Sequence, residues 1–400
     1  DALPISNPFV VGSGPTARMV DQLKEAEDHQ WAAASLKLSI RPTPYMNLPP
    51  RYRWFGKQKY NIFSAEKRLN ADEGLKLVED AKKALTTMKV IPNITYDGAD
   101  IEGWGQLAAD FEEAGADAIE LNLCCPNMSF NVSSTGGTIA HATGASMGQS
   151  SEATRAAVEA VLERTSLPVI AKLTPVGDKI GMVAAAAIAA GAAATGSTAN
   201  RLGIPDFDIY NGTKSVYRMV QENTLGCLSG PWILPLALKD TVDVRRGVGP
   251  EACVFASGGI SNLKSAVQHI MCGADLLWVC TETMVRGFAW LPKLLEDLKQ
   301  YLTDLECTSL REIRDTYITN LSPATELTVA TGVAKVNPEL CRACGKCLPL
   351  GHCNAMEADE QGIAYVVPDR CTGCSSCVDI CPFDAIGMFD ETGAPVEVVR

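Results

Sequence analysis

Cys371-Thr-Gly-Cys374-Ser-Ser-Cys377-Val-Asp-Ile-Cys381-Pro382 is the most informative stretch of this chain. Its spacing, C-x2-C-x2-C-x3-C-P, is typical of bacterial ferredoxins with two 4Fe–4S clusters, in which the fourth cysteine of each run binds the other cluster. A related run precedes it. The spacing predicts two sets of ligands, namely Cys341, Cys344, Cys347 and Cys381 for one cluster, and Cys371, Cys374, Cys377 and Cys353 for the other.

Other interpretations of these cysteines fit the pattern less well. A zinc site needs four ligands, but neither the ordered triplets nor the Cys-Pro pair. A disulfide framework is typical of small secreted domains, whereas this chain has 400 residues and we expect no signal peptide. Five residues, Leu348 to His352, precede Cys353 where three are usual, and we expect this longer loop to reach the cluster.

The composition limits the remaining classes of protein. The residues before the ferredoxin pattern are enough for one large α/β barrel or two ordinary domains. A net charge of −12 argues against binding to nucleic acid or an anionic membrane. The most apolar stretch, Met182 to Ala194, has 13 residues and is too short to span a bilayer. Seven further scattered cysteines, together with the clusters, indicate a reducing, cytoplasmic location.

Short β-branched segments alternate with helical patterns before residue 309. Such alternation predicts a parallel sheet, and eight units predict a (β/α)8 TIM barrel. A doubly wound fold is less favoured, since no Gly-x-Gly-x-x-Gly follows the first strand. We therefore predict a barrel at 1–308, a connector at 309–334 and a small α+β ferredoxin domain at 335–400. The expected strands are Phe9–Gly12, Ala33–Leu38, Val90–Thr95, Ala118–Leu123, Val169–Leu173, Ala193–Ser197, Val254–Ala256 and Leu276–Cys280.

The ends of these strands carry residues suited to chemistry, because barrel active sites form at the carboxyl ends of the strands. Ser229-Gly230 and Ser257-Gly258-Gly259 offer bare backbone N–H groups that suit a phosphate, or else make ordinary turns. Lys37 and Lys172 end core strands, where they either reach solvent or face an anionic cofactor such as a reduced flavin.

Cys124 and Cys125 end the fourth predicted strand, directly before Pro126. A cysteine at this position can donate or accept a proton. Only one of the pair can face the barrel mouth if the segment is extended, and Pro126 favours an extended Cys125. We therefore expect Cys125 to be the reactive thiol and Cys124 to be a small buried hydrophobe.

Nearly the whole chain, from about Ile5 to Met388, resembles the dihydroorotate dehydrogenase-like flavoprotein family, and within it the pyrimidine-reducing enzymes of the dihydropyrimidine dehydrogenase type. The resemblance rests on a series of motifs in order along the chain, followed by the ferredoxin pattern. These motifs are Asn7-Pro-Phe, Glu120-Leu-Asn-Leu-Cys-Cys-Pro, Gly148-Gln149, Ala171-Lys-Leu-Thr-Pro, Leu228-Ser-Gly and Ser257-Gly-Gly-Ile.

The resemblance implies a set of binding and catalytic residues. Cys125 matches the family's catalytic cysteine, and Asn61 and Asn122 match residues that bind the amide edge of the substrate. FMN would be held by Ser13, Lys37, Asn122, Lys172, Gly230, Gly258, Gly259 and Thr281, with Ser229 and Ser257 beside the phosphate.

The same resemblance implies the reaction. Electrons enter singly through two 4Fe–4S clusters and collect on FMN, whose N5 passes a hydride to a C=C bond of uracil or thymine while Cys125 protonates the neighbouring carbon. The reverse reaction uses Cys125 as the base. An FAD- and NAD(P)-binding subunit or a ferredoxin would exchange the electrons, within a homo-oligomer or a hetero-oligomer.

Two departures from the family pattern leave other substrates open. The family's sixth strand ends in an Asn-Thr pair that binds the pyrimidine, whereas this chain has Ala199-Asn200, and the loop from Asn127 to Ser146 is longer. The same machinery could therefore act on another conjugated cyclic enone, amide or acid. A third hypothesis is an electron-transfer subunit without a substrate of its own.

Overall fold

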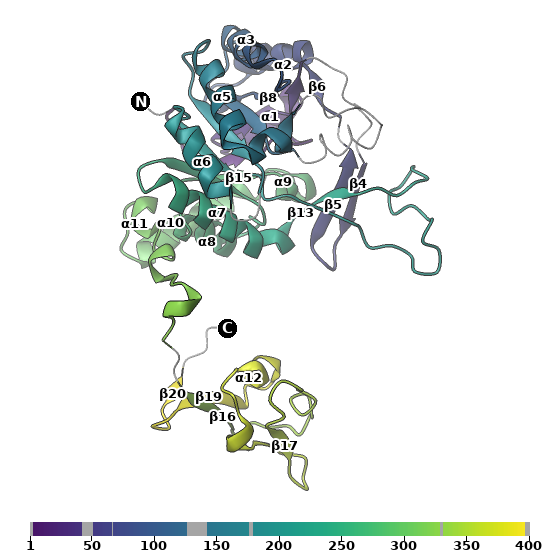
Figure 1. Cartoon of the computed structure of the whole chain (residues 1–400), viewed down its shortest axis with the longest axis vertical. Coiled ribbons are helices and arrows are strands. Elements are labelled where there is room, and N and C mark those ends of the chain that lie inside the picture. Colours follow the sequence, from purple (N-terminus) through teal and green to yellow (C-terminus); the bar gives the residue numbers. More distant parts are fainter. Residues whose placement is uncertain are drawn as a thin grey trace. The chain divides into compact units, whose positions relative to one another are not determined.

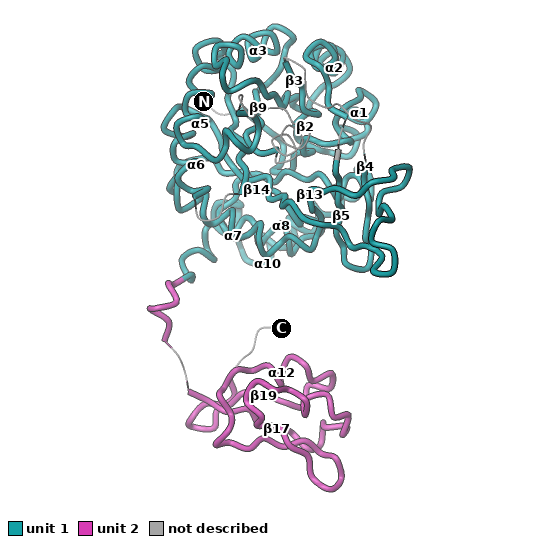
Figure 2. Tube along the Cα trace, turned by 45° about the vertical axis from the view of Figure 1, so that its right-hand side comes forward, with its two compact units in different colours: residues 1–321 teal, residues 322–400 magenta. Residues whose placement is uncertain are grey.

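The structure is a computed structural model that describes residues 3–41, 51–65, 67–125, 142–175, 179–328 and 331–396. It divides into two compact units, Asp1–Leu321 and Ser322–Arg400 (Figure 2). The division falls inside the connector predicted at 309–334, and the short helix α11 (Leu310–Ile313) belongs to the first unit.

The centre of the first unit is a parallel sheet of eleven strands among the described residues. Two of the eight predicted strands are interrupted and therefore count twice. The second splits into β2 (Ala33–Ser35) and β3 (Ser39–Ile40), and the third into β7 (Lys89–Ile91) and β8 (Asn93–Thr95). Pro92 separates the latter pair, since proline has no N–H to donate to a ladder.

The sheet closes into a barrel through these split strands. On one side β2 pairs with β7, on the other β3 pairs with β8, and β1 pairs with both β2 and β15. The predicted (β/α)8 fold is therefore confirmed. The other strands of the sheet are β1 (Phe9–Val11), β6 (Leu69–Asn70), β9 (Ile119–Leu123), β10 (Val169–Leu173), β11 (Ala194–Ser197), β14 (Cys253–Ser257) and β15 (Leu276–Val279).

The barrel interior is a packed core. One side chain from each of the eight passes of the chain contributes to a single buried apolar cluster, as expected for layers inside a small barrel. Its members are Val10, Ala33, Ile91, Ala118, Ile170, Ala194, Phe255 and Trp278.

Helices surround the sheet (Figure 1). Helix α2, for example, is amphipathic: it buries Leu77, Val78 and Ala81 and begins at a capping box between Asn70 and Glu73. The helices of the first unit are α1 (Val20–Asp28), α2 (Ala71–Ala84), α3 (Ile101–Glu113), α5 (Ser151–Leu162), α6 (Ile180–Ala189), α7 (Leu234–Val248), α8 (Leu263–Met271), α9 (Thr281–Arg286) and α10 (Leu291–Asp304), followed by α11.

A four-stranded antiparallel sheet projects from the barrel (Figure 1), and the sequence did not lead us to expect it. Its order is β12 (Arg201–Gly203), β13 (Gly226–Ser229), β5 (Tyr60–Ala65) and β4 (Arg51–Phe55). It joins segments that are more than 130 residues apart in the sequence. This sheet matters for the site because β5 and β13 both carry predicted binding residues.

The second unit is small and mainly β. Strand β19 (Ile386–Asp390) lies between β16 (Gly332–Val336) and β20 (Pro395–Val396), and β17 (Met356–Ala358) forms a hairpin with β18 (Ala364–Val366). A short helix, α12 (Ser376–Ile380), runs between Cys374 and Cys381. These elements form the α+β ferredoxin domain that the cysteine spacing predicts.

Candidate active site

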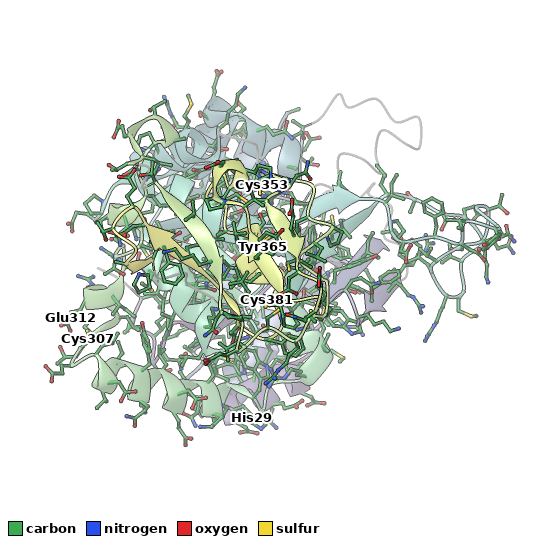
Figure 3. The ribbon with its side chains drawn as sticks, turned by 90° about the horizontal axis from the view of Figure 1, so that it is seen from below. His29, Cys307, Glu312, Cys353, Tyr365 and Cys381 are labelled. Atoms are coloured by element: carbon green, nitrogen blue, oxygen red, sulfur yellow. The ribbon has the colours of Figure 1, made fainter. Side chains whose placement is uncertain are left out.

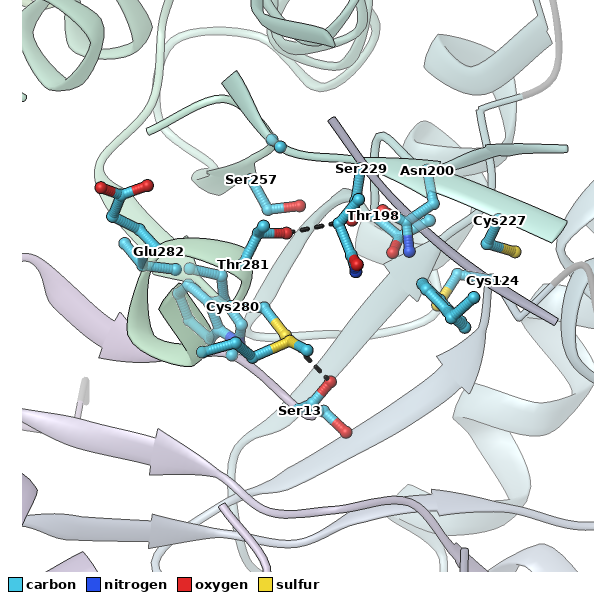
Figure 4. Close-up of a pocket in the computed structure, with 18 of the residues that line it drawn as sticks. Ser13, Cys124, Thr198, Asn200, Cys227, Ser229, Ser257, Cys280, Thr281 and Glu282 are labelled. Carbon is cyan, nitrogen blue, oxygen red and sulfur yellow. Dashed lines mark hydrogen bonds between the residues drawn. The ribbon is translucent and has the colours of Figure 1, made fainter. Parts of the chain in front are cut away.

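A cavity lies at the carboxyl ends of the barrel strands, where β5 and β13 meet the barrel (Figure 4). The structure brings every predicted barrel site residue to the lining of this one cavity. They are Ser13, Lys37, Asn61, Asn122, Cys125, Lys172, Asn200, Ser229, Gly230, Ser257, Gly258, Gly259 and Thr281.

An ion pair lies at the base of the cavity. Lys172 Nζ is 3.1 Å from Glu120 Oε1, and both side chains are buried. Burial is the largest single effect and lowers the pKa of Lys172. The charge of Glu120, the hydrogen bond to it and smaller contributions from nearby groups together outweigh burial, so the pKa of the lysine lies above its usual range. The counter-charge of Lys172 is therefore Glu120, and the expectation that an anionic cofactor supplies it is wrong.

Glu120 is held by neutral donors as well. Its carboxylate accepts hydrogen bonds from Ser35 Oγ at 2.6 Å, from Trp278 Nε1 at 2.7 Å and from Asn93 Nδ2. These donors satisfy the buried charge and fix its position. Lys172 is therefore a fully charged cation that faces the cavity at a fixed place.

A chain of amides continues from Glu120 to the reactive cysteine. Asn122 Nδ2 donates to Asn93 Oδ1 at 2.9 Å, and Asn122 Oδ1 accepts from the backbone N–H of Cys125 at 3.1 Å. Since Asn122 and Glu120 are two residues apart on β9, they lie on the same face of the strand. Asn122 thus connects the base of the cavity with the position of Cys125.

Two glycines after β14 shape one wall of the cavity. Gly258 and Gly259 have φ values of +99° and +79°, which disfavour side chains. A Cβ at Gly258 would lie 2.5 Å from Ala199 Cβ, and one at Gly259 would lie 2.6 Å from Leu234 Cβ. The bare backbone therefore borders the cavity at close range, as an oxyanion or phosphate cradle requires.

His269 supports this turn from behind. Its Nε2 lies 2.9 Å from Gly258 O, and its Nδ1 lies 3.1 Å from Thr241 Oγ1, so the ring bridges α7 and the glycine turn. Burial lowers the pKa of His269 to about 4, although the contact with Gly258 acts in the other direction.

The depressed pKa of His269 predicts a pH-dependent stability. Protonation is favoured in the unfolded chain below its ordinary pKa of 6.5, so the free energy of unfolding falls as the pH drops from 6.5 toward 4. We expect His269 to account for a loss of about 2 kcal/mol between pH 7 and pH 5. Urea unfolding followed by tryptophan fluorescence measures it, since all six tryptophans lie in the first unit.

His269→Gln is the comparison variant for this measurement, because glutamine keeps a hydrogen-bonding side chain but does not titrate. Its free energy of unfolding should change less than that of the wild type over the same pH range. Equal slopes for the two proteins would contradict the buried, neutral state of His269.

Asn61 projects into the cavity from β5. It is 4 % exposed, and its Nδ2 has no hydrogen-bond partner among the described residues. The pairing of β5 with β13 places it opposite Ser229. A buried amide without a partner costs free energy, so this donor is suited to a ligand that brings an acceptor.

The strand-end residues of β11 do not take the places that the family pattern implies. Ala199 is buried with φ at +57°, and its Cβ packs close to Gly258. Thr198 and Asn200 line the cavity instead (Figure 4). The polar pair of this strand end is therefore Thr198 and Asn200, which are separated by the inward-turned Ala199.

Cys125 and its neighbour Cys124 have different environments. Burial raises the pKa of the Cys124 thiol to about 12, so Cys124 stays protonated. Cys125 is partly exposed, packs beside Leu38 and Ile40, and accepts a hydrogen bond from Arg68 Nη2 at 3.6 Å. Pro126 and the loop through residue 141, to which the sequence argument also referred, lie outside the described residues.

The cysteines of the second unit surround two separate hollows. One is lined by Cys341, Cys344, Cys347 and Cys381, and the other by Cys353, Cys371, Cys374 and Cys377. These are the two sets that the spacing predicts. Cys353 and Cys381, which end the two runs, are marked in Figure 3. Within the described part of the chain, no group of three or more His, Cys, Asp or Glu side chains is arranged to hold a single metal ion.

Three residues in or beneath the cavity were not predicted as site residues from the sequence, namely Glu120, Thr198 and Arg68. Glu120 had a detectable signal, because an acidic residue inside an apolar strand needs a buried partner. Thr198 could have been inferred from its place at a strand end. Arg68 had no such signal, because it precedes the two-residue strand β6 and reaches Cys125 only through the fold.

Fold and site together define a TIM-barrel protein with a strand-end cavity and a ferredoxin unit. The family model described as dihydroorotate dehydrogenase matches residues 3–302, and the model of the 4Fe-4S binding domain matches residues 364–387. The chain belongs to the dihydroorotate dehydrogenase family. It is a flavoprotein oxidoreductase with an iron–sulfur domain.

Individual relatives agree with this assignment. The NAD-dependent dihydropyrimidine dehydrogenase subunit PreA of Escherichia coli is 28 % identical over 363 residues, which cover 85 % of this chain and 81 % of the relative. The catalytic subunit of dihydroorotate dehydrogenase B (NAD(+)) from Thermococcus kodakarensis is 34 % identical over 220 residues, 55 % of this chain and 66 % of the relative. The same subunit from Pyrococcus abyssi is 32 % identical, with 59 % and 71 % covered.

The cavity fits the FMN that this family implies. Lys37 and Lys172 bring two buried cations to its lining, and the turn at Gly258 and Gly259 brings bare backbone. Thr281 Oγ1 and Ser229 Oγ lie 3.0 Å apart on adjoining walls (Figure 4). This donor set suits a flavin with an anionic phosphate.

No helix in the described ranges is long and apolar enough to cross a membrane.

Proposed function

We propose that this protein reduces the activated C=C bond of a pyrimidine base, converting uracil or thymine to the dihydropyrimidine, or catalyses the reverse reaction. The observation that carries the proposal is that the buried Nδ2 of Asn61, in the same cavity as Cys125, has no hydrogen-bond partner among the residues that the structure describes. An amide donor without a protein partner suits a ring carbonyl of the substrate. The names of the Escherichia coli and Thermococcus relatives, a dihydropyrimidine and a dihydroorotate dehydrogenase, support a ring of this class.

FMN, when bound, supplies the hydride through its N5 atom. We assign its binding to Ser13, Lys37, Asn122, Lys172, Ser229, Gly230, Ser257, Gly258, Gly259 and Thr281, all of which line the cavity. The ammonium group of Lys172, held in place by Glu120, is a hydrogen-bond donor at the lining of the cavity. The glycine turn offers its backbone to the phosphate.

Cys125 gives the proton in this proposal. The hydrogen bond from its backbone N–H to Asn122 fixes its main chain, and its partial exposure lets the thiol reach a bound ring. In the reduction direction the thiol protonates the carbon next to the reduced one. In the reverse direction the thiolate removes that proton.

Three asparagines and one threonine would form hydrogen bonds with the amide edge of the substrate. Asn122 uses its oxygen for the backbone of Cys125, so it offers an N–H to the ring. Asn61 and Asn200 reach the cavity from β5 and from the end of β11, with Thr198 beside Asn200. Ala199 contributes no polar group. This favours a second candidate for the substrate, namely another conjugated cyclic enone, amide or acid.

We also propose two 4Fe–4S clusters and an external electron partner. The two four-cysteine hollows support the number of clusters. The description of the Escherichia coli relative as an NAD-dependent subunit supports a partner that binds FAD and NAD(P), a ferredoxin being the alternative. The cluster pattern, together with seven further cysteines, supports a reducing, cytoplasmic location.

An anaerobic experiment tests these proposals together. The purified protein is reduced with dithionite, the excess is removed, uracil or thymine is added, and the flavin and cluster absorbances are followed. Reoxidation with formation of the dihydropyrimidine supports the proposal. A flavin that stays reduced with both bases, but is reoxidised by another conjugated compound, supports the second candidate.

Iron analysis should give about eight iron atoms per chain, because each of two clusters contains four. A value of about four would leave one of the two cysteine-lined hollows without a cluster.

Asn61→Ala should raise the KM for the pyrimidine roughly tenfold, because it removes one buried hydrogen bond to the ring. The flavin content and the rate of reduction by dithionite should stay as in the wild type. Asn211→Ala, on an exposed loop, is the matched control. An unchanged KM in Asn61→Ala would contradict the proposed hydrogen bond from Asn61 to the ring, and with it the main support for the substrate assignment.

A further inference from the structure

Arg68 is a buried cation in the cavity that neither the family pattern nor the flavin site uses. Its side chain is 3 % exposed, although it directly precedes the short edge strand β6. Arg68, Asn61 and Cys125 line the same cavity. A buried guanidinium in contact with the thiol that the proposed reaction uses can influence that thiol directly.

The contact is a hydrogen bond to sulfur. Arg68 Nη2 donates to Cys125 Sγ over 3.6 Å, which is within the range for a sulfur acceptor. Cys125 also packs against the apolar Leu38 and Ile40. A thiolate formed here would be poorly solvated on the apolar side, and the guanidinium is the group placed to stabilise it.

We propose that Arg68 is a positioning residue that holds the side chain of Cys125 toward the cavity and stabilises its thiolate form. The inference rests on the proposed function, in which Cys125 exchanges the proton. When the S–H bond breaks and the new C–H bond forms, the S–H electron pair stays on sulfur. Arg68 then faces the negative charge that this step creates, and the same contact keeps a thiolate base ready for the reverse reaction.

Other charged and titratable groups also border this space. The cation of Lys172 is paired with Glu120, and the thiol of Cys124 stays protonated, so neither takes the place of Arg68 beside the sulfur. Besides Arg68 and Cys125, the charged or titratable side chains that line the cavity are Lys37, Tyr52, Cys124, Lys172, Cys227, Cys280 and Glu282.

The test measures the thiol itself, without substrate. Full-length wild type, Arg68→Gln and Arg68→Lys are treated with iodoacetamide between pH 5 and pH 9, and the modification of the Cys125 peptide is timed by mass spectrometry. Because only the thiolate reacts, the rate reports its population. We expect Arg68→Gln to react roughly tenfold more slowly at pH 7 and Arg68→Lys to recover much of the rate.

Arg155→Gln is the matched control, since Arg155 is exposed on α5 and does not line the cavity. Its alkylation profile should match that of the wild type. Turnover should show the same order, with kcat of Arg68→Gln falling about tenfold while KM changes little.

An alkylation profile of Arg68→Gln that coincides with the wild type would overturn the inference, as would an altered KM with unchanged alkylation, which indicates substrate binding instead. Arg68→Lys decides the case if Arg68→Gln does not fold. Then a rate near that of the wild type supports the role of the charge, and a rate at pH 7 that is about tenfold below that of the wild type contradicts it. The alkylation result does not depend on the substrate, so a wrong substrate assignment leaves this test intact.

Discussion

Cys125→Ala should lower pyrimidine turnover by about 10²- to 10⁴-fold, because the variant lacks the group that exchanges the proton with the substrate carbon. Flavin content, cluster absorbance and reduction by dithionite should stay as in the wild type, since the thiol holds neither cofactor in our assignment. Single-turnover reoxidation of the reduced protein by uracil measures the loss directly, without the electron partner.

Cys253→Ala serves as the control for this variant. Cys253 begins β14 at the opposite end of the strand from Ser257, and it does not line the cavity. Its replacement should leave the reoxidation rate nearly unchanged. Full activity in Cys125→Ala would show that another group exchanges the proton and that Cys125 is not the catalytic acid.

Glu120→Gln should lower the free energy of unfolding of the barrel by about 3–5 kcal/mol. The change leaves the buried cation of Lys172 without its partner and turns an N–H toward Ser35, Asn93 or Trp278, all of which already donate to this side chain. Urea unfolding followed by tryptophan fluorescence measures the effect in the first unit alone.

A double-mutant cycle separates the ion pair from the general cost of the change. Adding Lys172→Met to Glu120→Gln removes the unpaired cation, so part of the lost stability should return. Flavin affinity should fall in both proteins that lack Lys172. If Glu120→Gln is as stable as the wild type, the Glu120–Lys172 pair is not what holds the base of the cavity together.

Local patterns in the sequence determined much of this molecule. The cysteine spacing led to the ferredoxin unit, because ligands a few residues apart restrict how one short segment can fold around a cluster. The alternation of strands and helices led to the barrel, and with it to the edge where Cys125, Lys172 and Gly258 had to meet. Parallel strands bring their carboxyl ends together, so the position of a residue within its own strand was sufficient.

Only the tertiary structure decided which side chains make pairs. Lys172 lies 52 residues from Glu120, and Arg68 lies 57 residues from Cys125, and in each case a closed barrel has to bring the two together. Asn61 reaches the cavity because β5 pairs with β13, a long-range antiparallel pairing that no local pattern announces. Local periodicity in the sequence determined the eight barrel strands and the edge at which the site forms. The partner of each buried charge depended on packing between distant segments, whose geometry exists only once the barrel has closed.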